Sequence, residues 1–159
     1  MYQRILVPVD GSTTSGMGLD EAIKLAKLTG AELRLVHVVD VLTFATGFEP
    51  YGVYASDVIP IMREAGWKIL NQAMTHVSAH GVKVDGKLFD SLAHRVSDTV
   101  VEQAQAWAAD LIVIGTHGRR GIKRLMLGSD AEQILRMAPV PVLLVRSAEV
   151  TEKKGDAPQ

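Results

Sequence analysis

The chain has 159 residues, of which 47% are hydrophobic and 22% are charged, and its formal net charge at pH 7 is -1. This length and apolar content suit one compact domain with a sizeable core, and the near-neutral charge argues against a general binder of nucleic acid or other polyanions. The absence of cysteine excludes disulfides and thiolate metal sites.

Strand-like and helix-like segments alternate along the chain, starting with an apolar strand directly after the first residues. Because no long apolar segment precedes that strand, we expect a cytoplasmic protein with no membrane anchor. Alternation of this kind predicts a parallel sheet with helices on both faces, because parallel neighbours need a crossover connection. In chain order we predict strand Arg4–Val9, helix Ser15–Leu28 ended by Gly30, strand Leu33–Val39, helix Asp57–His80 with Pro60 in its first turn, strand Val82–Phe89 at a sheet edge, helix Val96–Ala109, strand Leu111–Ile114, helix Asp130–Met137 and strand Val140–Val145.

Two segments lack a regular pattern. Asp40–Ser56 contains several glycines and aromatic residues, and loops of this length are often functional, so it could serve as a lid or as a partner surface. Ser147–Gln159 is polar, and we expect a disordered tail that leaves residues 1–146 as the folded domain.

A run of spaced glycines ends in a hydroxyl residue: Gly115-Thr-His-Gly118, nine further residues, then Gly128-Ser129. The run leaves the carboxyl end of an apolar strand and leads into a predicted helix. A helix N-terminus offers free backbone N–H groups and a positive dipole end, and glycines let an anion approach them closely. The spacing therefore predicts a phosphate-binding loop.

A purely structural interpretation fits the same residues. Gly118 and Gly121 suit tight turns, and Ser129 with Glu132 fits a capping box at the start of the next helix, worth about 1 kcal/mol. The two interpretations are compatible, because a serine hydroxyl at a helix start can both cap the helix and contact a phosphate.

Asp10-Gly11-Ser12 directly follows the first predicted strand. In a doubly wound sheet, ligands bind beyond the carboxyl ends of the strands at the point where the strand order reverses, which lies beside the first strand. We therefore expect Asp10 to project into the same crevice as the glycine loop, where it could accept hydrogen bonds from ribose hydroxyls or an adenine amino group. The alternative is a simple turn that opens the following helix.

Three segments between about Arg4 and Arg146 carry a family pattern: Ile-Leu-Val-Pro-Val-Asp-Gly-Ser, Ala-Asp-Leu-Ile-Val-Ile-Gly-Thr-His-Gly-Arg, and Pro-Val-Pro-Val-Leu-Leu-Val-Arg. With them the chain resembles the universal stress protein family, in its ATP-binding subgroup. The signature of that subgroup, Gly-x2-Gly-x9-Gly-(Ser/Thr), is met at Gly115, Gly118, Gly128 and Ser129.

The resemblance implies a single-domain α/β fold of the adenine nucleotide alpha hydrolase-like type, with a doubly wound five-stranded parallel sheet in the order 3-2-1-4-5. It implies ATP, ADP or AMP as the ligand, with or without Mg²⁺. The amides of Ser129 and the next residue would bind phosphate, and Val38 would contribute largely through its backbone. The implied adenosine pocket is lined by Pro8, Val9, Asp10 and Val38.

The resemblance also implies a homodimer, and the closing strand offers a surface for it. Val140–Val145 would be an edge strand in this strand order, and it carries no charge before Arg146. An uncovered apolar edge is an aggregation hazard. We therefore expect two copies to pair through this strand.

Asp130 departs from the family pattern, in which valine or another small apolar residue often follows the Gly-Ser pair. A carboxylate in the first helical turn gains about 0.3–1 kcal/mol from the helix dipole when the site is empty, and it repels a phosphate when the site is filled. We therefore expect weaker binding of ATP relative to AMP. Arg119 could offset the repulsion, or it could be an ordinary solvated charge.

Three functions remain open: a nucleotide-binding stress-response regulator, a slow ATPase, and a scaffold dimer with a vestigial pocket. The complete phosphate loop favours the first. No residue stands out as an activated nucleophile or a positioned base, so we predict no catalytic residue. The chain lacks the glycine pattern of P-loop NTPases, and the loop after its first predicted strand lacks the glycine pattern of dinucleotide binders. His76 and His80 lack a visible third ligand, so we predict no metal site.

Overall fold

The computed structural model describes residues 1–41, 55–92, 94–116 and 127–146. Five parallel strands form one sheet in the order β3-β2-β1-β4-β5. This architecture confirms the predicted α/β class and strand order, and it places β3 at an edge as expected. The strands are β1 (Arg4–Pro8), β2 (Glu32–Val39), β3 (Val84–Asp90), β4 (Leu111–Gly115) and β5 (Val142–Val145).

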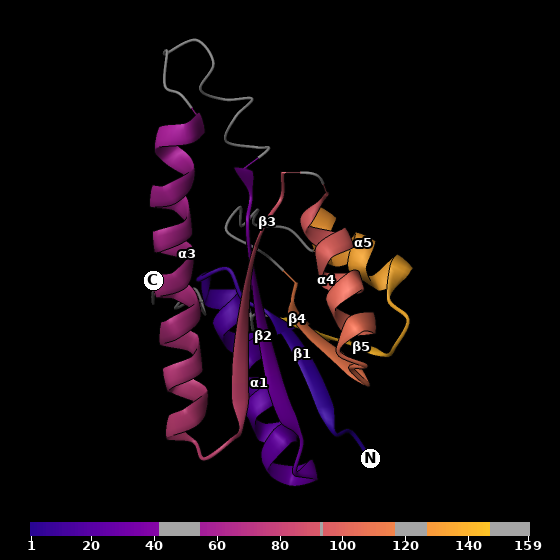
Figure 1. Cartoon of the computed structure of the whole chain (residues 1–159). Coiled ribbons are helices and arrows are strands. Elements are labelled where there is room, and N and C mark those ends of the chain that lie inside the picture. The colour runs from indigo at the N-terminus through magenta and orange to yellow at the C-terminus, as the bar shows by residue number, and fades with distance from the viewer. Residues whose placement is uncertain (42–54, 93, 117–126, 147–159) are drawn as a thin grey trace, which may run out of the picture.

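Helices cover both faces of this sheet (Figure 1). Alternate side chains of the central strands enter two hydrophobic clusters, one on each face. Ile5, Leu35 and Val113 belong to the cluster that contains residues of α1 and α3, whereas Leu6 and Ile112 belong to the cluster that contains residues of α4 and α5. The helices are α1 (Thr13–Thr29), α3 (Ala55–Ala79), α4 (Val96–Ala106) and α5 (Ser129–Met137).

Helix α1 begins at Thr13, two residues before the predicted start, and ends at Thr29, directly before the predicted stop at Gly30. The Ser12 hydroxyl caps the N-terminus by accepting a hydrogen bond from the Ser15 N–H at 3.2 Å. Gly30 ends the helix in the left-handed conformation, with φ of 76°, and its N–H donates to the Ala26 carbonyl at 2.8 Å. A left-handed residue at this position is usually glycine, so the predicted role of Gly30 is confirmed.

Helix α4 ends three residues before the predicted boundary, at Ala106 rather than Ala109. Ala108 adopts a left-handed φ of 52°, and the N–H groups of Ala108 and Ala109 donate to the carbonyls of Gln105 and Ala104. This is a Schellman ending with alanine where glycine is usual. The Arg4 guanidinium also donates to the Trp107 carbonyl at 2.9 Å, which ties the helix end to β1.

Several other boundaries differ from the prediction by one or two residues, and two of these differences involve prolines. Helix α3 begins at Ala55, so Pro60 lies in its second turn rather than its first. Strand β5 begins at Val142 rather than Val140, because Pro139 and Pro141 interrupt the regular ladder before it.

Several predictions fall outside the described residues. These are Gly118 and Arg119 of the glycine loop, residues 42–54 of the predicted loop Asp40–Ser56, and the tail from 147 to 159; the last two residues of that predicted loop instead begin α3. Within the described ranges, no helix is both long and apolar enough to cross a lipid bilayer.

Candidate functional site

The carboxyl ends of β1 and β4 lie side by side at one edge of the sheet. The two strands are hydrogen-bonded neighbours, with Ile5 opposite Leu111 and Leu6 opposite Ile112. The chain returns to this edge at the start of α5, where the Gly128 N–H donates to the Thr116 carbonyl at 3.0 Å. The segment after β1, the end of β4 and the start of α5 therefore converge where the strand order reverses, the usual ligand position in such sheets.

Asp10 lies in the turn between β1 and α1 and is half-buried. Its Oδ1 accepts a hydrogen bond from the Ser12 N–H at 2.8 Å, so the carboxylate does stabilise the turn. The turn interpretation of Asp10 is therefore correct. It is compatible with ligand binding because a carboxylate has two oxygens that accept several hydrogen bonds.

The other three predicted pocket residues surround the same strand ends. Pro8 is the last residue of β1 and is half-buried, whereas Val9 is buried. Val38 lies near the end of β2, where it packs against the hydrophobic cluster of α4 and α5. The structure thus brings Pro8, Val9, Asp10 and Val38 to one edge of the sheet.

Gly115 has a structural role that the motif alone does not reveal. A Cβ added at this position would lie 2.4 Å from the Thr14 carbonyl oxygen and 2.6 Å from the Thr14 carbonyl carbon. A Cβ at Gly18 would likewise lie 3.1 Å from the Gly115 nitrogen. The end of β4 and the first turns of α1 therefore pack backbone against backbone, which requires glycine at position 115 whether or not a ligand binds.

The start of α5 corrects the predicted capping box. Gly128, not Ser129, is the N-cap residue, and no side chain caps this helix end. Ser129 is the first helical residue, and the Glu132 side chain pairs instead with Arg136 at 2.9 Å. The Gly128 N–H is already bonded to Thr116, so the amides of Ser129, Asp130 and Ala131 are the donors that this helix end can offer to an anion.

Comparisons with known proteins agree with this geometry. The model of the universal stress protein family matches residues 1–146. The chain belongs to this family. It is 34% identical over 146 residues to universal stress protein MJ0531 of Methanocaldococcus jannaschii, covering 92% of this chain and 83% of that protein.

Two solved structures extend the comparison. A universal stress protein from Burkholderia pseudomallei is 31% identical, with a TM-score of 0.72 and coverage of 92% of this chain and 97% of that one. A universal stress protein solved in complex with cAMP is 26% identical, with a TM-score of 0.65 and coverage of 92% and 98%.

Asp130 of this universal stress protein lies in an acidic environment that the sequence did not reveal. Partial burial raises the pKa of its carboxyl above the ordinary value of 3.8, the negative charges of Asp40 and Asp10 raise it further, and Arg95 opposes them. Asp40 follows β2, and its Oδ1 accepts a hydrogen bond from the buried Ser91 hydroxyl at 3.3 Å. Asp40 could have been found from its place after a predicted strand, whereas nothing in the local sequence marks Arg95.

Asp130→Asn should raise the free energy of unfolding at pH 7 by up to about 1 kcal/mol, a small effect because the carboxylate is partly solvated. A raised pKa means that the folded chain binds the proton more tightly than the unfolded chain. The contribution of Asp130 to stability should therefore fall as the pH rises from 3.8 through the folded pKa, and the advantage of the variant over wild type should disappear below pH 3.8. Urea unfolding of both proteins across this pH range measures the difference. Lower stability of the variant at pH 7 would mean that the helix dipole outweighs the acidic neighbours.

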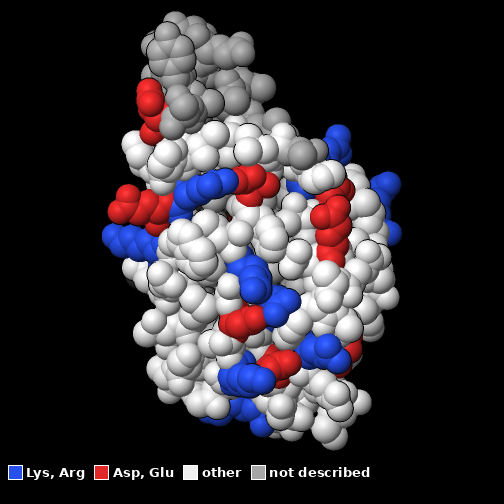
Figure 2. Space-filling view, viewed as in Figure 1, with Lys and Arg blue, Asp and Glu red and all other residues white. Residues whose placement is uncertain are grey.

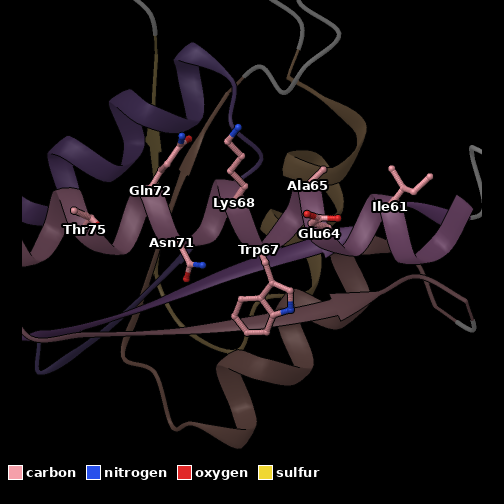
Figure 3. Close-up of a pocket in the computed structure, with 8 residues that line it drawn as sticks. All are labelled: Ile61, Glu64, Ala65, Trp67, Lys68, Asn71, Gln72 and Thr75. Atoms are coloured by element: carbon pink, nitrogen blue, oxygen red, sulfur yellow. The ribbon is translucent and has the colours of Figure 1, made fainter.

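One hollow on the described surface of this family member lies away from the predicted site. On the face shown in Figure 2, acidic and basic side chains are interspersed rather than segregated. A shallow hollow of about 830 Å³ lies along the outer side of α3, and Figure 3 shows that all of its lining residues come from that one helix. None of them is a predicted site residue, and a hollow lined by one helix lacks the converging elements of a ligand pocket.

His76 lies near the end of α3 and His80 follows it, and each histidine has its own hydrogen-bond partner. His76 Nε2 lies 2.7 Å from Asp20 Oδ1, and His80 Nδ1–H donates to the His76 carbonyl at 2.8 Å. Among the described residues, no group of three or more potential ligands could hold a metal ion.

Proposed function

We propose that this universal stress protein binds adenine nucleotides and acts as a homodimer in the cytoplasm. The observation that carries the proposal is the convergence of the Asp10 turn with the uncapped start of α5 at the reversal point of the sheet. The structural neighbour solved with cAMP supports an adenine nucleotide as the ligand class.

The proposed site divides the ligand between two groups of residues. Asp10 would accept hydrogen bonds from ribose hydroxyls or the adenine amino group, with Pro8, Val9 and Val38 around the adenosine. The amides of Ser129 and Asp130 would bind phosphate at the positive end of α5. The motif residues Gly118 and Arg119 would complete the phosphate side, and the ligand would be ATP, ADP or AMP with or without Mg²⁺.

Gly128→Val should weaken binding of AMP, ADP and ATP at least about tenfold, equivalent to 1.4 kcal/mol, because a side chain obstructs the approach of the phosphate that all three share. The backbone conformation at Gly128 suits valine, since φ is −59° and ψ is 150°, and among the described residues an added Cβ would meet only the Thr116 oxygen, at 3.6 Å. Isothermal titration calorimetry with the three nucleotides provides the measurement.

Gly16→Val is the matched control, because nothing lies within 4 Å of a Cβ at that helical position. It should leave all three affinities unchanged. Equal binding by wild type and Gly128→Val would show that the phosphate does not bind at this helix end. A wild type that binds none of the nucleotides would favour the alternative of a scaffold with a vestigial pocket. The negative charges of Asp40 and Asp130 at this site support that alternative, because they repel phosphate. The ratio of AMP to ATP affinity in the same titrations measures the repulsion by Asp130.

A further inference from the structure

The peptide bond between Val9 and Asp10 is held at both of its polar atoms. On one side, His37 Nδ1–H donates to the Val9 carbonyl at 2.7 Å. On the other side, the Asp10 N–H donates to the Ser15 hydroxyl at 3.1 Å. His37 and Ser15 are 7% and 8% exposed, so both bonds form away from water and are electrostatically stronger there.

His37 fits into a notch in α3 that only glycine provides. A Cβ at Gly66 would lie 2.9 Å from His37 Cδ2 and 2.9 Å from Leu88 Cδ1. A glycine in the middle of a helix is about 1 kcal/mol less favourable than alanine, and burial of an imidazole is unfavourable unless it is hydrogen-bonded. An aliphatic residue at position 37 would fill this core position without either disadvantage. The hydrogen bond to Val9 supplies a physical reason for histidine at this position.

The held peptide determines where the Asp10 carboxylate can lie. His37 and Ser15 restrict the backbone that enters Asp10, and the Ser12 N–H holds its Oδ1 at 2.8 Å. Three elements, β2, α1 and the turn, therefore orient one carboxylate before any ligand arrives. Orientation in advance lowers the entropic penalty of binding, and it depends on buried supporting side chains.

We propose that His37 and Ser15 are positioning residues that fix the Val9–Asp10 peptide and thereby orient the Asp10 carboxylate toward the nucleoside part of the ligand. The inference rests on the proposed nucleotide binding. Neither residue touches the ligand, so the effect of each on binding passes through Asp10.

The test compares His37→Leu with His37→Asn. The asparagine amide nitrogen can take the place of Nδ1 as donor to Val9, whereas leucine fills space but donates nothing. The probes are AMP, 2′,3′-dideoxy-AMP, which lacks the ribose hydroxyls, and IMP, which lacks the adenine amino group. Wild type should prefer AMP over one of the two analogues. His37→Leu should reduce that preference at least about fivefold through weaker AMP binding, and His37→Asn should retain most of it.

This preference distinguishes positioning from general loosening, which would weaken AMP and its analogues alike. Ser15→Ala removes the second support and should reduce the same preference, so the test does not depend on one variant being folded. A preference unchanged in both His37→Leu and Ser15→Ala would overturn the positioning role while leaving nucleotide binding intact. A wild type without any preference would also overturn it, and a wild type that fails to bind AMP would overturn the proposed function itself.

Discussion

Gly115→Ala should destabilise the folded chain by at least about 3 kcal/mol, the upper end of the usual range for overpacked interiors. The added methyl would lie 2.4 Å from the Thr14 oxygen, and this neighbour is backbone in the first turn of α1 rather than a flexible side chain. Relief of the contact requires α1 to move away from β4. For a chain of this size, about 3 kcal/mol corresponds to a fall in Tm of about 6–12 °C, which differential scanning calorimetry measures readily.

The two glycines of α1, Gly16 and Gly18, provide graded controls. Gly18→Ala should have an intermediate effect, because its Cβ would lie 3.1 Å from the Gly115 nitrogen. Gly16→Ala meets nothing within 4 Å and should stabilise the helix by about 1 kcal/mol. If Gly115→Ala has the same Tm as wild type, the close contact between α1 and β4 is absent in solution, and the glycine serves only the ligand.

The order of elements could be predicted from the sequence because each element carries its own local signal. The buried runs of β1 and β4 are almost continuously apolar, as expected for strands covered on both faces. Ser12 and Gly30 mark the two ends of α1 in the sequence itself. In contrast, the chain leaves α4 through Ala108 in a left-handed conformation, and an alanine in the sequence does not predict such a helix end.

The errors at α5 and within the site have a different origin. Ser129 and Glu132 fit a capping box, but the hydrogen bond from Gly128 to Thr116 shifts the helix start by one residue. The same limit applies to His37, whose partner Val9 lies 28 residues away, and to Arg95, which acts on Asp130 from another helix. Residues at strand ends were predictable because topology places them, whereas their supporting contacts cross between elements and leave no local pattern.

Leu144→Lys should convert the proposed homodimer to a monomer. Among the described strands, β5 bonds only to β4, and all four of its residues are half-buried in the single chain. Pro141 and Val145 direct their carbonyls toward β4, so the alternating ladder turns the N–H and C=O groups of Val142 and Leu144 toward the open edge. Pairing two such edges about a two-fold axis would satisfy these groups and cover the side chains, whereas two facing lysines would repel each other.

Two apolar side chains of α5, the helix that precedes β5 in the chain, are also exposed. Leu135 is 46% exposed and Met137 is 40% exposed, and both precede β5 closely in the chain. Light scattering over a range of concentrations should give a dimer mass for wild type and half that mass for Leu144→Lys. Leu28→Lys is the control for an added charge, because Leu28 is 81% exposed at the end of α1 and should leave the dimer intact. A monomeric wild type, or a Leu144→Lys variant that remains dimeric with unchanged stability, would show that β5 is not the dimer interface. The strand would then be a free edge, and its short length and the flanking prolines would have to prevent aggregation.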